Sequence, residues 1–474
     1  MFRRQHLMQL AYWGKLTLLL DGWNELSPAS RLHAISSLEA LGRDYPQLGI
    51  VISSRRKESV MTGPAVQVLP LTAAQQNEIA AGALGDNGVE LLARASLARG
   101  IRDLTSVPLY LNALALESGS ALPATREALL RLLVKQHTTS PAQVEHVQAA
   151  TYGFENEILC SLADHATQSG ITAIPAREAN AVVSKTLRIL AEAGQLAAGL
   201  PPIPVIDALV AVHLLIRSAG DQAPISFQHQ LFQEWFASTQ VESLMKESAT
   251  GSDQARRELR EKVLDNPMWE ESILLACERV SRENSDGTCA VARVVVETLG
   301  IDPILTAVMI SRSSLQVWEQ VKHKTLEFID AWHLPGNIDR AARFMVVSGR
   351  PEFADEVWAI ICSDNLHHTD IFDAGNLVNL NVLGPDREAR IMALALALPV
   401  PVPQRTVLLT SIIQYGSYED LELATTVAMN EPDPSLIMEV LAILDFREGD
   451  GQIKRIMASA ADHIWGIEMP LLDR

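Results

Sequence analysis

Two carboxylates near the start of the sequence have the type and spacing for magnesium-dependent phosphate chemistry. The apolar run 16–20 ends directly in Asp21, Gly22 follows, and Glu25 lies a few residues further on. An Asp at the end of a buried strand can hold Mg²⁺ through water, because a hard cation prefers oxygen ligands. A neighbouring Glu can orient and deprotonate an attacking water. The competing interpretation is that these acids only cap the next helix, which we expect to begin near Ser27.

The residues around this turn predict a strand–helix–strand unit. Two nearly continuous apolar runs, 16–20 and 49–53, are typical of parallel strands buried on both faces. Between them Ser27 is a suitable N-cap, and Pro28 fits the first position of a helix. A third short strand is expected at 66–69. This unit is the repeating part of an α/β domain, but it has too few strands for a full doubly wound sheet. The sequence therefore predicts an α/β domain that is incomplete at its N-terminus.

The segment LLLDGWNEL, followed by VISSRR, resembles the NACHT family of STAND P-loop NTPases. The resemblance implies that Asp21 is the Walker B aspartate that holds Mg²⁺ through water, and that Glu25 orients the hydrolytic water. Asn24 replaces the first acid of the family's acidic pair. Ser54 and Arg55 match the sensor at the end of the next strand, where the Arg would face the γ-phosphate. The alternative for Arg55 is a solvated turn after the strand.

Two further segments match the family in the expected order. SVPLYL resembles the helical-domain motif whose proline packs against adenine, which corresponds to Pro108. SFQHQLFQEWFAS resembles the winged-helix signature, whose histidine contacts the β-phosphate of bound ADP and corresponds to His229. Without the resemblance, Pro108 is simply a good helix N-terminus and His229 a hydrogen-bonded core residue. NPMWEESILLAC, 266–277, resembles the helix that commonly follows this module, so the resemblance covers roughly the first 280 residues.

The phosphate-binding loop of such an enzyme is missing from the sequence. That loop needs G-x-x-x-x-G-K-[ST], so that backbone N–H groups, a Lys and a hydroxyl surround the phosphates. The nearest candidate, Gly14-Lys15, has no upstream glycine, and Leu16 occupies the Ser/Thr position. Either the sequence is a truncated form of a complete NACHT protein, which we favour, or it is a shortened product that no longer binds nucleotide. ATP or ADP and Mg²⁺ are therefore expected as cofactors, and ATPase activity as a function, only if a P-loop is supplied upstream.

The rest of the sequence predicts a mainly α protein with a partial α/β P-loop unit at its N-terminus. We expect the C-terminal part of a NACHT core at 1–70, a helical domain at 71–148 and a winged-helix domain at 149–250. The region 251–474 consists of amphipathic segments separated by Pro, Gly and Asp. Helix pairs recur there at roughly 30–40 residues, which is typical of α-solenoid repeats with a sensor or scaffold role.

Composition limits the classes of partner and the compartment. The 474 residues carry a net charge of −18, which argues against a general nucleic-acid or anionic-membrane binder. The four cysteines form no CxxC pair, which indicates reduced core residues in a cytoplasmic protein. No segment reaches the roughly 18 uninterrupted apolar residues that a membrane span requires.

Two functional hypotheses follow. The resemblance implies a signalling ATPase, with a possible role in innate immunity, in which ligand sensing by the helical region permits ADP–ATP exchange and oligomerisation. The alternative is a nucleotide-independent helical scaffold that binds a protein partner or a second copy through its helical surface. A metal- or nucleophile-based hydrolase has little support, because the sequence contains no HExxH, GxSxG or clustered Cys/His pattern.

Overall fold

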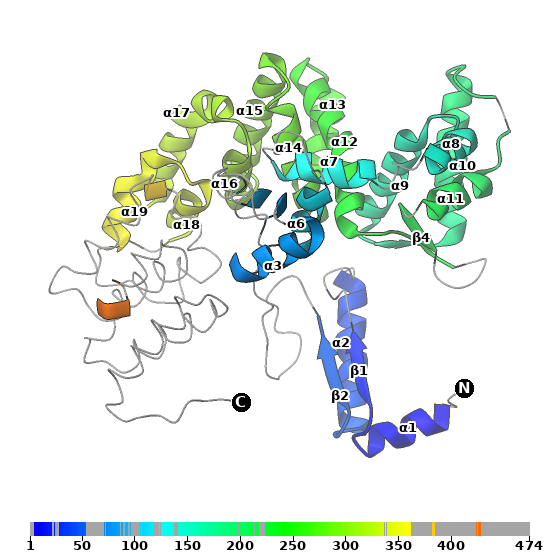
Figure 1. The fold of residues 1–474 in the computed structure, drawn as a ribbon. Helices are drawn as coiled ribbons and strands as arrows, with labels where there is room; N and C mark the ends of the chain where they lie inside the picture. The colour runs from blue at the N-terminus through cyan, green and yellow to red at the C-terminus, as the bar shows by residue number, and fades with distance from the viewer. Residues whose placement is uncertain are drawn as a thin grey trace, which may run out of the picture. The chain divides into compact units, whose positions relative to one another are not determined.

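The computed structural model describes a mainly helical chain with two small sheets, one of them a parallel pair near the N-terminus (Figure 1). The described residues are 4–20, 23, 28–53, 71, 73–85, 87–88, 91–92, 95, 105, 107–116, 123, 125–136, 141–197, 199–212, 214–217, 223–335, 337, 339–361, 382–383, 423 and 425–427. None of the helices among them is both long enough and apolar enough to cross a bilayer. The chain divides into two compact units, 1–69 with 134–240 (unit 1) and 70–133 with 241–474 (unit 2).

The first part of unit 1 contains the expected strand–helix–strand unit. Its elements are α1 (Arg4–Tyr12), β1 (Thr17–Leu20), α2 (Pro28–Asp44) and β2 (Gly49–Ile52). The strands pair in parallel with Leu20 opposite Ile52, and α2 begins at Pro28, as the sequence predicts. The third strand expected at 66–69 lies outside the described residues.

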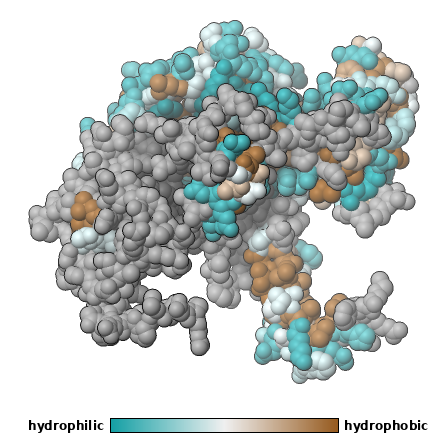
Figure 2. All heavy atoms as spheres, viewed as in Figure 1, coloured by the Kyte–Doolittle hydropathy of each residue, from teal (hydrophilic) through white to brown (hydrophobic). Residues whose placement is uncertain are grey.

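The expectation that β1 and β2 are buried on both faces is wrong for this structure. Leu19 and Val51 lie opposite each other and are 73% and 55% exposed. Side chains alternate along a strand, so these two share one face, while the intervening residues on the other face are half-buried. Figure 2 shows hydrophobic surface along this segment. No described element covers this face, although its apolar residues are of the kind that a buried sheet requires.

The second part of unit 1 contains a small antiparallel sheet between helices. Its elements are α8 (Pro141–Thr151), α9 (Glu155–Ser169), β3 (Ala173–Ile174), α10 (Ala176–Glu192), α11 (Pro202–Ala211), β4 (Leu215–Arg217), β5 (Ile225–Phe227) and α12 (Gln230–Ala249, which continues into unit 2 from Val241). The strand order is β3-β5-β4, so the last strand pairs with both others from the centre of the sheet. Helix α9 packs against α10, and α11 packs against α8 and α10.

Unit 2 is built from helices. Its elements are α3 (Ala73–Leu84), α6 (Pro108–Leu116), α7 (Arg126–Gln136, which ends in unit 1), α13 (Asp253–Glu258), the π-helix η2 (Leu259–Leu264), the 3₁₀ turn η3 (Pro267–Trp269), α14 (Glu270–Val280), α15 (Ser285–Leu299), α16 (Pro303–Arg312), α17 (Leu315–Trp332), α18 (Arg340–Ser348), the 3₁₀ turn η4 (Pro351–Phe353) and α19 (Ala354–Ile361). Helix α14 packs on α16 and α16 on α18, while α15 packs on α17. Alternate helices therefore stack in two layers, and successive pairs begin at Glu270, Pro303 and Arg340.

Side-chain caps define where several of these helices begin. The Asp302 carboxylate accepts hydrogen bonds from the backbone N–H groups of Ile304 and Leu305 at 2.9 and 3.0 Å. The Asp339 carboxylate accepts one from Ala342 and also contacts His333. Burial alone would raise the pKa of Asp339, but the backbone N–H donors and His333 lower it. These caps satisfy donors at helix N-termini that have no partner within the helix.

The start of α15 requires a residue without a Cβ. An ideal Cβ built on Gly287 would lie 2.3 Å from the backbone oxygen of Val280, at the end of α14. Since a backbone carbonyl cannot move as a flexible side chain does, α14 and α15 can approach this closely only through glycine.

We expect Gly287→Ala to lower the free energy of unfolding by about 2 kcal/mol through overpacking. The matched control is Gly300→Ala at the other end of α15, where the nearest atom to a new Cβ is 3.8 Å away. Urea denaturation followed by circular dichroism measures both. Equal midpoints for the two variants would contradict the close contact at Gly287.

Candidate functional site

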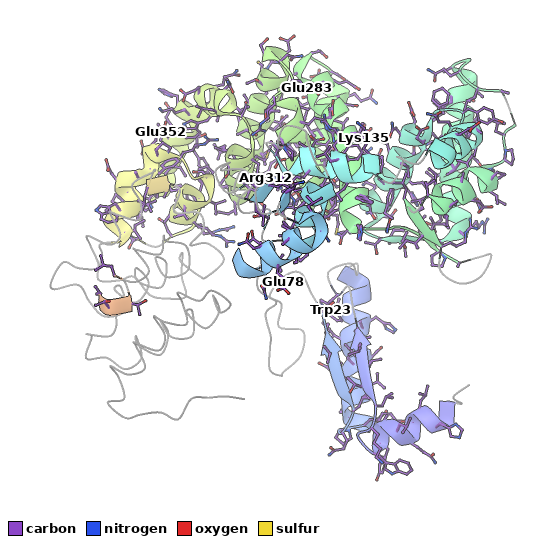
Figure 3. All side chains as sticks on the ribbon, in the orientation of Figure 1. Trp23, Glu78, Lys135, Glu283, Arg312 and Glu352 are labelled. Carbon is purple, nitrogen blue, oxygen red and sulfur yellow. The ribbon has the colours of Figure 1, made fainter. Side chains whose placement is uncertain are left out.

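The strand ends that precede the proposed catalytic residues lie side by side. The backbone N–H of Ser53 donates to the carbonyl of Leu20 at 2.9 Å, and the N–H of Trp23 donates to the carbonyl of Ser53 at 3.1 Å. Trp23 is only 4% exposed (labelled in Figure 3). The carboxyl ends of both parallel strands therefore meet at one edge, which is where α/β folds place ligands.

The catalytic candidates themselves lie outside the described residues. Asp21 and Glu25 flank Trp23 in the sequence, and Arg55 comes shortly after Ser53. The structure thus describes the neighbours that bring these segments together but not the three side chains. Among the described residues, no group of three or more His, Cys, Asp or Glu side chains is placed to hold a metal ion. The Mg²⁺ role of Asp21 stays a prediction.

His229 lies at the exposed end of the small sheet. It comes two residues after β5, and its side chain is exposed, with its ring 5.3 Å from that of Phe232 in an edge-on arrangement. The backbone carbonyl of His229 accepts a hydrogen bond from the N–H of Phe232 at the start of α12. The alternative of a buried core histidine is wrong for this structure.

The aromatic residues around His229 form the core beneath it. Phe227, Phe232 and Phe236 are at most 5% exposed, and the rings of Phe227 and Phe236 lie 5.9 Å apart. Gln233 donates from Nε2 to Thr167 Oγ1 at 3.2 Å and is 3% exposed, so it ties α12 to α9. The phenylalanines and Gln233 of SFQHQLFQEWFAS thus stabilise the junction between β5 and α12, whereas His229 in the same segment is exposed.

Pro108 begins α6 and belongs to unit 2, whereas the other four candidate residues belong to unit 1. Its side chain is exposed, while Tyr110, Leu111 and Leu114 on the same helix are buried. This placement fits both interpretations made from the sequence, a proline at the first turn of a helix and a proline available to a ligand.

Unit 2 contains a network of buried and half-buried charges that the sequence patterns did not predict, which we call the α14 ion-pair network. Its members are Arg126 and Glu127 on α7, Glu242 on α12, Glu271, Glu278 and Arg279 on α14, and Arg312 on α16. Arg312, labelled in Figure 3, reaches Glu278 through Nε and Glu271 through Nη1, the latter at 2.9 Å. Arg279 bridges Glu127 at 2.9 Å and Glu242 at 3.0 Å.

Both carboxylate oxygens of Glu278 accept a hydrogen bond. Its side chain is 5% exposed; one carboxylate oxygen accepts from Arg312 and the other from the backbone N–H of Glu127 at 2.8 Å. Burial alone would lower the pKa of Arg312, but the charges of Glu271 and Glu278 raise it above its ordinary value. For Glu242, burial would raise the pKa, yet hydrogen bonds from Lys246 and Arg279 lower it. Arg312 and Glu242 are therefore held in their charged forms.

A sequence signal for this network exists, although it is weak. Glu278 and Arg279 interrupt the apolar run ILLAC of α14, and Glu127 lies among the leucines of α7. Charges inside apolar helices indicate buried partners, but which charges pair depends on helix packing, which periodicity does not predict.

A scan against protein-family models finds no family that matches this chain, and a comparison with curated proteins finds no relative.

We expect Glu278→Gln to lower the free energy of unfolding by about 3 kcal/mol, because Arg312 loses one of its two carboxylates in a buried setting. The matched control is Glu192→Gln, which breaks the exposed pair with Arg188, where both side chains are 70% exposed. That change should cost well under about 1 kcal/mol. Urea denaturation of both variants measures the difference; similar small losses would show that the buried network contributes little.

Asp164 on α9 is a buried carboxyl group without a partner for one oxygen. Its Oδ1 is buried and has no hydrogen-bond partner among the residues that the structure describes, and burial raises the pKa of the group from 3.8 to about 7. A raised folded-state pKa means that the folded chain binds the proton more tightly than the unfolded chain does. Stability from this group is therefore fully present at low pH and is lost as pH rises from about 4 through about 7.

We expect Asp164→Asn to be more stable than the wild type above pH 7, by about 2 kcal/mol or more, since each pKa unit corresponds to about 1.4 kcal/mol. The difference should shrink toward pH 4. Thermal unfolding across this range measures it, with Asp207→Asn, an exposed Asp in the same unit, as the control. A gain that does not depend on pH would contradict the titration of Asp164.

Proposed function

We propose that this chain forms part of a nucleotide-regulated signalling ATPase of the NACHT type. The observation that carries the proposal is the exposure of His229 at the end of β5, directly above the buried aromatic core. A histidine with only a packing role would lie in the core with Phe227, Phe232 and Phe236. An exposed one, held at a sheet–helix junction, is available to a phosphate, as the resemblance implies.

The order of elements in unit 1 supports a winged-helix module around His229. Helix α9 is followed by β3, two helices, and then the hairpin β4–β5, whose last strand is central in the sheet. A helix, a strand, two helices and a two-stranded wing form the order of such a module. In the proposal, His229 contacts the β-phosphate of ADP and stabilises the resting state of the protein.

The N-terminal strands would supply the hydrolytic half of the same site. Asp21 would hold Mg²⁺ through water, Glu25 would orient the attacking water, and Arg55 would face the γ-phosphate. When bound, Mg²⁺ neutralises charge that develops on the phosphates. Carboxylate oxygens suit this hard cation, and the hydrogen bond from Trp23 to Ser53 supports a shared edge for the two segments. Pro108 would pack against adenine.

The stacked helices of unit 2 support a sensing role and also the alternative function. Two layers of alternate helices, α14–α16–α18 and α15–α17, are typical of an α-solenoid. We propose that this array binds a protein ligand, or a second copy of the chain, in the cytoplasm. If nucleotide plays no part, the same surface makes the chain a helical scaffold.

The nucleotide proposal predicts distinct results for the chain alone and for a version extended by a G-x-x-x-x-G-K-[ST] segment. The chain alone should bind a fluorescent ATP analogue weakly, and submicromolar affinity would contradict this. In the extended version, His229→Ala should weaken ADP binding about tenfold or more, because a hydrogen bond to a charged phosphate contributes about 1.5–3 kcal/mol. Isothermal titration calorimetry measures the affinity.

The matched control is His323→Ala, since His323 is an 86% exposed histidine in unit 2. Asp21→Ala in the extended version should abolish Mg²⁺-dependent ATP turnover. Signalling that survives Asp21→Ala unchanged would favour the scaffold.

A further inference from the structure

A cavity of about 620 Å³ in unit 2 is lined by cations, although the chain as a whole is strongly acidic. Arg256 on α13, Arg260 on η2, Arg293 on α15 and Lys324 on α17 contribute the positive charges, and Glu297 on α15 contributes the single carboxylate of the lining. We call this the α15–α17 cavity. Figure 2 shows mainly hydrophilic surface over α13 and α15. Four cations against one carboxylate leave a local excess of positive charge.

The charges of this cavity are only partly neutralised. Arg256 contacts Glu297 at 3.4 Å, a loose pair in which the arginine is 61% exposed. Arg293 donates from Nη1 to the backbone carbonyl of Ala249 at 2.6 Å, so it has no carboxylate partner in that contact. Arg260 and Lys324 are exposed and make no ion pair with a described carboxylate.

The floor of the cavity is apolar and rigid. Ala292 and Val296 on α15 and Val321 on α17 line it, and these two helices pack against each other. Ala292 and Val321 are buried, so they form part of the contact between the helices. The cavity therefore combines a fixed apolar surface with a rim of exposed guanidinium and ammonium groups. This combination suits an organic molecule that carries negative groups.

We propose that the α15–α17 cavity binds a small organic phosphate ester. Arginine forks bind the oxygens of phosphate and of carboxylate in pairs. A phosphate ester carries about −1.5 to −2 charges and three acceptor oxygens, so several cations around one group favour it over a single carboxylate. The volume falls within the range of about 300–1,000 Å³ that is typical of small-molecule sites. An extended polyanion such as a nucleic acid would also meet the acidic remainder of the chain, whereas a small ligand meets only the cavity.

In this arrangement each lining residue has a defined part. Arg260 on η2 and Lys324 on α17 bind phosphate oxygens, and Arg256 also binds the phosphate when it releases its loose contact with Glu297. The freed Glu297 carboxylate accepts a hydrogen bond from a hydroxyl of the ligand body, which rests against Val296. The site does not depend on the nucleotide proposal, because its residues lie outside every segment assigned to nucleotide, and so the two can fail separately.

Alkylation of Cys289 can report whether a ligand occupies the α15–α17 cavity. Cys289 lines the cavity and is half-buried, while Cys160 on α9 is also half-buried but belongs to the other unit. Cys277 is fully buried, and burial raises the pKa of its thiol to about 12, so it does not react. A ligand in the cavity should therefore slow alkylation of Cys289 by iodoacetamide and leave Cys160 unchanged, as peptide mass spectrometry can measure.

The direct test is calorimetric titration of the full chain with fructose 1,6-bisphosphate as the probe. We expect saturable one-to-one binding that weakens tenfold or more in Arg260→Glu and in Lys324→Glu. Arg177→Glu, which makes the same charge change at an exposed position on α10, should bind as the wild type does. Fructose should not bind, and citrate should bind more weakly than the bisphosphate.

Several results would overturn the proposal. The first is the absence of saturable binding together with unchanged Cys289 alkylation. The second is a loss of affinity in Arg177→Glu equal to that in Arg260→Glu and Lys324→Glu. The third is protection of Cys160 to the same degree as Cys289. Citrate binding as tight as that of the bisphosphate would show that the cavity selects charge alone and not phosphate. Because the alkylation readout uses the wild-type chain, the test holds even if a charge-reversed variant fails to fold.

Discussion

The carboxylate of Glu278 is the centre on which the arrangement of unit 2 depends. It joins α14 to α16 through Arg312 and α14 to α7 through the backbone of Glu127. Buried charges are costly unless every one is paired, so these helices must keep one register relative to one another. Hydrophobic packing alone tolerates small rotations of a helix, because apolar contacts have no direction. The α14 ion-pair network adds direction, and it joins two stretches of unit 2 that are more than a hundred residues apart in the sequence.

The structure separates residues that stabilise the fold from residues that face solvent. In the SFQHQLFQEWFAS segment, the aromatic residues and Gln233 make the internal contacts, while His229 lies at the surface. At the N-terminal strands, Trp23 is buried between two positions that carry the acids of the proposed site. In both places a large buried side chain is close in sequence to a polar residue that belongs to the proposed site. At the sheet–helix junction this arrangement fixes the backbone beside His229, while the histidine side chain stays exposed.

Local sequence patterns predicted the helices and strands well, but they did not predict the contacts between these elements. The apolar runs at β1 and β2 and the proline at the start of α2 predicted the parallel pair and its helix, since these signals act within a few residues. The exposure of Leu19 and Val51 was not predictable, because it depends on which other elements pack on the sheet. The α14 ion-pair network and the α15–α17 cavity were missed for a related reason. Their residues come from helices distant in sequence, and only packing brings Arg256, Glu297 and Lys324 together. The position of His229 was suggested by resemblance, but its exposure needed the structure.

The open face of β1 and β2 has a consequence for how the N-terminal segment behaves. A two-stranded ribbon is marginally stable in water by itself, and an uncovered apolar strand face favours association. The stability of this strand pair therefore depends on whatever shields Leu19 and Val51. Any molecule that covers this face, whether another polypeptide or a second copy, also stabilises the strand pair. Association through this face and the stability of the strand pair are then coupled, so dilution of the protein acts on both at once.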